Sequence, residues 1–190
     1  MRMKRVVLAV LLAAASCAPG NVRLTLQEAS PTYGPGDFAY AGAGRDMHVV
    51  VVGNPFGGDE AAFGRAVTDA MQGRHWGQRT NFTTTPGPDA RVRYRVVLLF
   101  DPPVAFNGAR LCRRPDSALP TQSGGGDVVL FAGFCRGKKV LTQIRGRIAG
   151  ATGPDDPAFR ELVGQVTNGL FPPDRGHDRD DDGCPPWIKC

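Results

Sequence analysis

The segment over residues 91–100 limits the possible folds of this chain more than any other. Its first half alternates arginine with apolar or aromatic residues, and its second half is apolar without interruption. Alternation with a period of two is typical of a strand with one exposed face, whereas a short continuous apolar run is typical of a strand covered on both faces. We therefore expect a strand that runs from an exposed edge into a covered sheet. Arg91, Arg93 and Arg95 would share one face of it, which is either solvated or open to anionic polymers and lipid headgroups.

The rest of the domain alternates strand and helix patterns. Further strands are expected at 47–52, 127–134 and 140–148, with a weaker one at 109–113. Apolar residues spaced three and four apart predict one helix over 60–72, behind the capping residue Asp59. A second helix is predicted from Pro157 until Pro172. The order β-α-β-β-β-β-α predicts a single α+β domain over 46–173, in which two helices cover one face of a mainly antiparallel sheet in a two-layer arrangement.

The N-terminus has the pattern of an export signal. Residues 1–5 include three basic side chains, and residues 6–15 are apolar and uncharged. As a helix, an apolar run of this length rises about 15 Å, half the thickness of a bilayer core, so it is too short to span a membrane. The small residues that lead to Cys17 resemble the lipobox of bacterial lipoproteins, in which cleavage precedes a cysteine that carries lipid, although Ala14 occupies the usual leucine position.

This resemblance implies a signal peptide over 1–16, lipidation of Cys17 and attachment to a membrane on its periplasmic side. Ala18, which follows the lipidated cysteine, is not the aspartate associated with retention at the inner membrane, and this favours the outer membrane. Ordinary signal cleavage near Ala15 or Ala18, which would give a soluble periplasmic protein, is the alternative.

Glycine and proline supply 25 and 16 of the 190 residues, and they are dense between residues 17 and 45. Breakers at this density predict a flexible, lipid-anchored tether over 17–45, with one short strand at 22–27. Such a spacer would hold the packed domain clear of the membrane.

The last residues, 174–190, form an acidic tail. Within it, Asp178, Asp180 and Asp182 match the opening half of a calcium-binding loop. Lys189 stands where such a loop needs a bidentate glutamate. A solvated tail is therefore the expectation, calcium at these aspartates is the weaker alternative, and no cofactor is predicted.

The cysteines beyond Cys17 are Cys112, Cys135, Cys184 and Cys190. An even number in an exported protein usually means disulfide bonds, and four cysteines allow three pairings. The sequence does not choose among these pairings, but proximity favours Cys112–Cys135 and Cys184–Cys190.

The net charge of +5 includes Arg2, Lys4 and Arg5 of the expected signal peptide. Without these, 20 of the 23 basic residues remain against 18 acidic residues. So small an excess gives no support to nucleic-acid binding. The expected partners are the membrane, through the anchor, and an unidentified envelope protein or polymer.

The connection over residues 73–88 is the most unusual stretch of the domain. It is long, and it carries the side chains of Arg74, His75, Trp76, Arg79 and Phe82. Loops of this length in compact domains tend to be functional, and Trp and Arg often dominate binding energy. We therefore expect a binding loop. The alternative is that Trp76 and Phe82 fold back as a lid on the core.

Motifs of known catalytic sites are missing from the sequence. None of the three histidines lies in a His-Glu-x-x-His motif, and no serine lies in Gly-x-Ser-x-Gly. This favours a non-catalytic binding or envelope-assembly module over an enzyme. The alternative is a small periplasmic hydrolase with an unfamiliar active site, in which Asp101 or His75 would be the titrating group.

Overall fold

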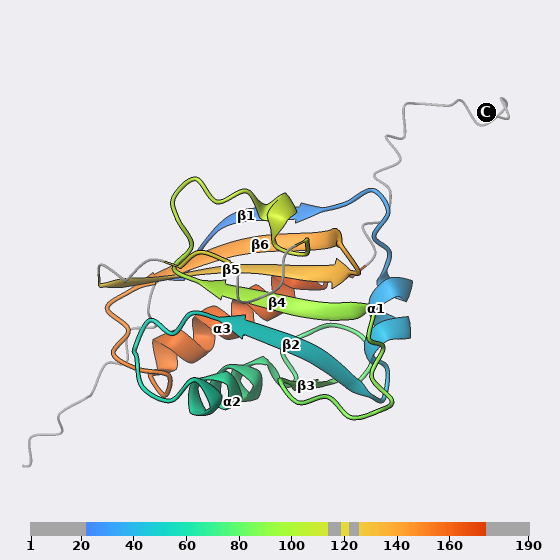
Figure 1. The fold of residues 1–190 in the computed structure, drawn as a ribbon, viewed down its shortest axis with the longest axis horizontal. Coiled ribbons are helices and arrows are strands. Elements are labelled where there is room, and N and C mark those ends of the chain that lie inside the picture. The colour runs from blue at the N-terminus through green and yellow to red at the C-terminus, as the bar shows by residue number, and fades with distance from the viewer. Residues whose placement is uncertain (1–21, 114–118, 122–125, 174–190) are drawn as a thin grey trace, which may run out of the picture.

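The computed structural model describes residues 22–113, 119–121 and 126–173. Within them, six strands form one mixed sheet in the order β1-β6-β5-β4-β2-β3 (Figure 1). Neighbouring strands from β1 to β4 are antiparallel, whereas β2 is parallel to both β4 and β3. The predicted α+β class with a mainly antiparallel sheet is therefore confirmed. The strands are β1 (Arg23–Ala29), β2 (Asp46–Val52), β3 (Asn81–Thr83), β4 (Tyr94–Phe100), β5 (Asp127–Arg136) and β6 (Lys139–Ala149).

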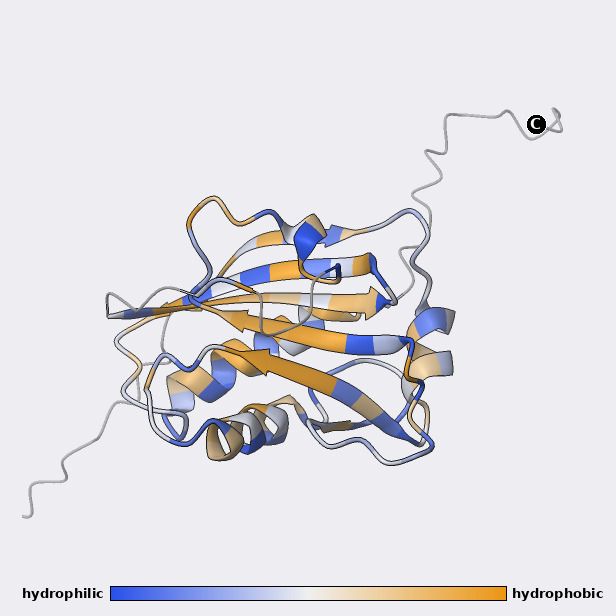
Figure 2. Cartoon of the chain, viewed as in Figure 1, coloured by the Kyte–Doolittle hydropathy of each residue, from blue (hydrophilic) through white to orange (hydrophobic). Residues whose placement is uncertain are grey.

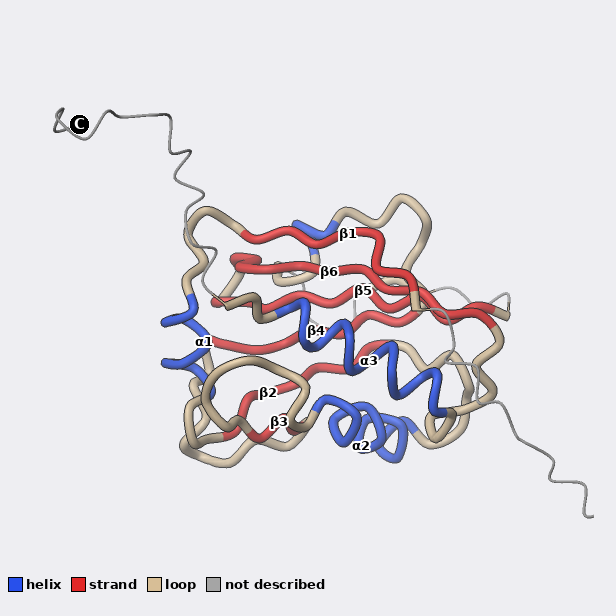
Figure 3. Tube along the Cα trace, turned by 180° about the vertical axis from the view of Figure 1, so that it is seen from behind, coloured by secondary structure: helices blue, strands red, loops and turns tan. Residues whose placement is uncertain are grey.

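Two helices cover one face of the sheet, as Figure 3 shows from that side. They are α2 (Glu60–Met71) and α3 (Pro157–Leu170). Each begins behind an aspartate, Asp59 or Asp156, whose side chain accepts a backbone N–H of the first turn. In the part of the chain that the structure describes, none of the helices is both long and apolar enough to cross a membrane.

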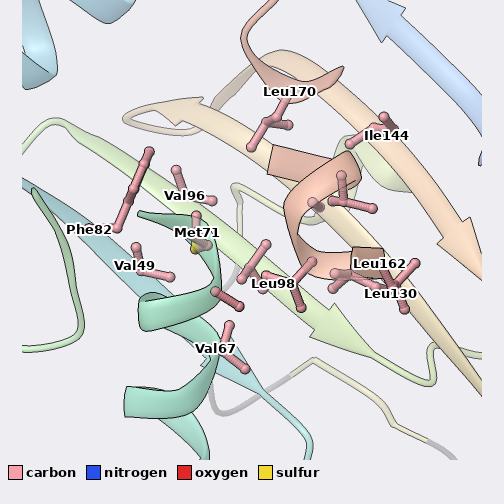
Figure 4. Packing of buried hydrophobic residues seen from close by; sticks show 14 of the residues in the cluster. Val49, Val67, Met71, Phe82, Val96, Leu98, Leu130, Ile144, Leu162 and Leu170 are labelled. Atoms are coloured by element: carbon pink, nitrogen blue, oxygen red, sulfur yellow. The ribbon is translucent and has the colours of Figure 1, made fainter. Parts of the chain in front are cut away.

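The larger part of the core lies between these helices and the sheet. Val67 and Met71 of α2 point toward the sheet beside Val49, and Leu162 of α3 lies beside Leu130 (Figure 4). All five side chains are buried. Apolar residues fill the later halves of β2 and β4, whose first residues are polar (Figure 2). This explains why the sequence over 91–100 changes character midway.

The opposite face is covered by an irregular segment between β4 and β5, which we call the cover segment (residues 101–113 and 119–121). It contains one short 3-10 helix, η1 (Gly108–Arg110). The prediction of a strand over 109–113 is therefore wrong. Leu111 and Cys112 are consecutive and pack into the same cluster on this face of the sheet, whereas successive side chains of a strand point to opposite faces.

Covalent and polar contacts hold the cover segment against the sheet. The disulfide Cys112–Cys135 joins it to β5 with a Cα–Cα distance of 5.7 Å, which confirms the predicted pairing. Arg95 of β4 donates hydrogen bonds to the carbonyls of Cys112, at 3.1 Å, and of Gly137, at 3.2 Å. This arginine is therefore part of the frame that positions the cover segment.

The strand predicted over 91–100 begins at Tyr94 in the structure. Arg91 lies before it and places its guanidinium over the ring of Tyr40, 4.7 Å from the centroid. Because Arg91 precedes the strand and Arg95 bonds the cover segment, the predicted stripe of three arginines on one strand face does not form.

The stretch from residue 22 to 45 is folded, where the density of breakers predicts a flexible tether. β1 pairs with β6 along its length, and a short helix, α1 (Pro35–Gly42), follows at one end of the sheet (Figure 1). Pro35 occupies the first turn of α1, where a missing N–H costs nothing, and Phe38 is buried. Here proline therefore starts a helix instead of marking an unstructured spacer.

Several predictions concern residues outside the described part of the chain. They are the signal peptide over 1–16, the lipidation site Cys17, the Cys184–Cys190 pairing, and the calcium candidates Asp178, Asp180 and Asp182.

Candidate functional site

The loop that follows α2 bends back beside α1 (Figure 3). It turns at Gly73 and Gly77, whose φ angles of 68° and 94° lie in the region that favours glycine. His75 Nε2 donates to the carbonyl of Gln78 at 2.8 Å, which closes the tip of the loop. Thr80 then donates its hydroxyl to the last carbonyl of α1 at 3.0 Å. The loop tip is therefore fixed at both ends.

His75 points into the domain. Its ring meets Phe38 and Phe82 edge-on, with centroid distances of 5.1 and 5.2 Å, and Phe171 lies 6.4 Å away. Nε2 donates to a carbonyl, and among the described residues the buried Nδ1 has no hydrogen-bond partner. His75 therefore packs between the loop and the core and helps to position the loop, and the residue as a whole is only partly buried.

Trp76, one residue later, points outward and is 62% exposed. It forms one wall of an apolar groove of about 450 Å³ between the loop, α1 and the residues after α3. Phe38 and Phe171, both buried, form the floor of this groove. Its other walls include Tyr33, Pro35, Pro172 and Pro173. We call this feature the Trp76 groove.

Another wall of the groove is held by Tyr33. Its hydroxyl donates to the carbonyl of Pro172 at 3.1 Å and so ties the start of α1 to the end of the described chain. Burial, with a smaller contribution from the charge of Asp37, raises the pKa of the Tyr33 hydroxyl to about 12. Tyr33 therefore remains a hydrogen-bond donor at neutral pH, and the groove keeps its shape.

A polar basin of about 330 Å³ adjoins the groove on the far side of Trp76. Arg74 and Glu161 face each other there at 3.4 Å, both partly exposed. Gln165 donates to the other carboxylate oxygen of Glu161 at 3.0 Å. Trp76 is thus a ridge between an apolar groove and a basin lined by charged and amide groups, an arrangement suited to a ligand with apolar and polar parts.

Four of the five residues predicted for the binding loop lie together at its tip: Arg74, His75, Trp76 and Arg79. Phe82 does not, because it is part of β3 and only 1% exposed. Phe82 is therefore part of the core, as the alternative of a lid predicts for it, whereas Trp76 is exposed, as a binding surface requires. The walls supplied by Tyr33, Pro35 and Pro172 were not predicted. The only signal for them was the clustering of proline and aromatic residues on either side of the domain.

Asp101, the other candidate for catalysis, has a different setting. It has a φ of 45° and is 7% exposed. Oδ1 accepts the N–H of Val129 at 2.9 Å, Oδ2 has no partner among the residues that the structure describes, and burial raises the pKa of the carboxyl group. Asp101 follows the last residue of β4, whereas His75 packs on Phe38, which contacts Phe134, the residue paired with Val96 near the start of that strand. A strand of this length covers about 20 Å, so the two groups cannot share one active site.

Metal binding finds no support among residues 22–113, 119–121 and 126–173, where no cluster of three or more His, Cys, Asp or Glu side chains could hold an ion. The Trp76 groove is therefore the feature of the described chain that bears most directly on function. No protein-family model matches the chain, and no curated protein matches it either.

Proposed function

We propose that this protein is a non-catalytic binding or assembly module of the bacterial cell envelope. In this proposal, lipid on Cys17 anchors the chain to a membrane, with the outer membrane favoured, and the domain faces the periplasm. The Trp76 groove binds part of an envelope protein or polymer. The observation that supports binding is the 62% exposure of Trp76 on a loop whose neighbours are fixed.

The loop that carries Trp76 is ordered before any partner binds, and this lowers the entropic cost of binding. A large aromatic side chain on a flexible loop would lose conformational entropy when a partner binds. Here His75 and Thr80 already fix the loop, so most of that cost is met by folding. An exposed, pre-positioned tryptophan beside an apolar groove is the kind of residue that dominates binding energy, commonly by about 2 kcal/mol or more.

The binding proposal is tested by crosslinking in intact cells. Trp76→Ala should retain the melting temperature of the native protein, because most of this side chain contacts solvent, and should lose the crosslinked partners. Tyr40→Ala is the matched control, because Tyr40 is also an exposed aromatic, at 56%, but lies outside the groove. A folded Trp76→Ala protein that captures an unchanged set of partners would refute the proposal.

The anchor is tested separately. Cys17→Ala should leave the chain unprocessed or soluble, because stable membrane attachment needs more than one acyl chain and the lipoprotein modification supplies them. If a chain of mature length carrying this substitution still partitions with membranes, the anchor is not the lipid.

A further inference from the structure

The Trp76 groove has a chemical counterpart in the last residues of the same chain. The sequence there includes Pro185, Pro186 and Trp187. We propose that the C-terminal segment 174–190 binds in the Trp76 groove of its own domain through these three residues, and so competes with the envelope partner. This inference rests on the proposed function, since it takes the groove to be a binding site.

The aromatic lining of the groove suits the prolines and the tryptophan of the segment. Grooves lined by aromatic side chains bind extended proline-rich segments, because such segments are ordered before they bind and lose little entropy. Trp76 and Tyr33 both line the groove, together with two buried phenylalanines. Pro185 restricts its neighbours to extended conformations, as Pro186 does, and Trp187 supplies a large apolar ring.

The segment begins directly beside the groove. Pro173, the last described residue, is itself part of the groove wall. Residues 174–184 separate it from Pro185, and a chain of this length spans about 35 Å when extended, enough to leave the groove and return. A segment tethered so closely has an effective concentration of about 1 mM, which favours it over a dilute partner.

A further argument is charge. The intervening residues carry the aspartates Asp174, Asp178, Asp180, Asp181 and Asp182. On the domain, Arg79 is exposed one residue beyond Gln78, which lines the groove, whereas Arg74, in the basin that Trp76 also lines, already faces Glu161. Opposite charges at the rim favour return of the segment, and salt should weaken this attraction.

Fluorescence tests the proposal directly, because Trp76 and Trp187 are the only tryptophans of the chain. In the full chain carrying Trp187→Phe, an aromatic ring is kept and Trp76 alone emits. We expect Trp76 to emit at a shorter wavelength than a solvent-exposed tryptophan and to be quenched less by acrylamide, because the segment covers the indole. Adding Pro185→Ser and Pro186→Ser to this chain should shift emission to longer wavelength and increase quenching several-fold. The matched control is Pro31→Ser, an exposed proline outside the groove, which should change neither reading.

Two results would overturn the proposal. Equal emission and quenching with and without Pro185 and Pro186 would show that the segment does not cover Trp76. Shielding that rises with protein concentration would show that the segment comes from a second copy.

Partner capture separates this inference from the proposed function. If the segment occupies the groove nine-tenths of the time, the Pro185→Ser and Pro186→Ser chain should bind the partner about tenfold more tightly. Loss of partners on Trp76→Ala, without any shielding of Trp76, would leave the binding function standing and this inference refuted.

Discussion

The two faces of the sheet are covered in different ways. On one face, α2 and α3 satisfy their own backbone hydrogen bonds and need only present apolar side chains. On the other, the irregular cover segment depends on a disulfide, on Arg95 and on the contact between Asp101 and Val129. The comparison shows that an irregular layer packs as tightly as a helical one only when side chains supply the anchors that a helix provides by itself.

On each face of the sheet, a leucine of the covering layer packs against a glycine of a strand, and these two leucines can be compared directly. A Cβ at Gly146 would lie 2.7 Å from Leu162 of α3, and a Cβ at Gly133 would lie 2.5 Å from Leu111 of the cover segment. We expect Leu162→Ala to have the larger effect, about 4 kcal/mol of unfolding free energy, because the helix cannot settle into the gap. Leu111→Ala should cost about 2 kcal/mol, because an irregular segment can relax.

Urea unfolding of both variants measures this difference. An equal or larger loss for Leu111→Ala would show that the cover segment is as rigid as the helices, and the comparison between the two faces would fail.

The disulfide should have the next largest effect. Replacing Cys112 and Cys135 together by alanine should lower the unfolding free energy by about 3 kcal/mol, largely because the unfolded chain gains freedom. Hydrogen exchange should become faster in residues 101–113 than in α2 or α3. A uniform increase in exchange over both faces would contradict a local role for the disulfide.

Arg95→Met should cost about 1–2 kcal/mol, because the carbonyls of Cys112 and Gly137 both lose the donor that Arg95 supplies. Arg93→Met is the control, since Arg93 is exposed and should change stability by less than about 0.5 kcal/mol. The loss should shrink in the protein without the disulfide, because both groups hold the same segment. Full additivity would indicate that Arg95 acts elsewhere.

Asp101→Asn should have the smallest effect, and of opposite sign. The pKa of Asp101 is raised by burial, so the folded state binds the proton more tightly than the unfolded state does. Its contribution to stability is therefore full below the unfolded pKa and is lost as pH rises through the folded pKa. At neutral pH, asparagine removes the buried charge and tolerates the positive φ, so we expect a gain of about 1 kcal/mol or less.

Thermal unfolding as a function of pH tests this sign. The gain from Asp101→Asn should vanish on acidification below the unfolded pKa of aspartate, where the native side chain is protonated too. A gain that persists there would mean that backbone conformation, and not charge, is responsible.

Local patterns were enough to predict the central strands, α2 and α3, because each carries its own periodicity. They were not enough for α1 or β3. The short helix α1 depends on the contact of Phe38 with Phe171, which is distant in sequence, and the three-residue strand β3 depends on pairing with β2. The same limit applies to the groove. The exposure of Trp76 could be proposed from its loop, but walls drawn from 33–39 and 171–173 meet only after folding.

Under the proposed function, the path of β1 would set the orientation of the module at a membrane. Arg23, at the start of β1, pairs with Arg147 of β6, which pairs with Val129 of β5 at the end of the sheet that holds Asp101. Seven residues later, at the opposite end of the sheet, the chain turns at Ser30 toward Tyr33 and the groove. If Cys17 carries lipid as proposed, residues 18–22 can span at most about 17 Å, and the end of the sheet that holds Arg23 would then face the bilayer. The groove then opens about 20 Å farther out, at the opposite end. Under the proposed function, the sheet itself would hold the groove away from the membrane, and a partner that approaches from the periplasm would meet Trp76 first.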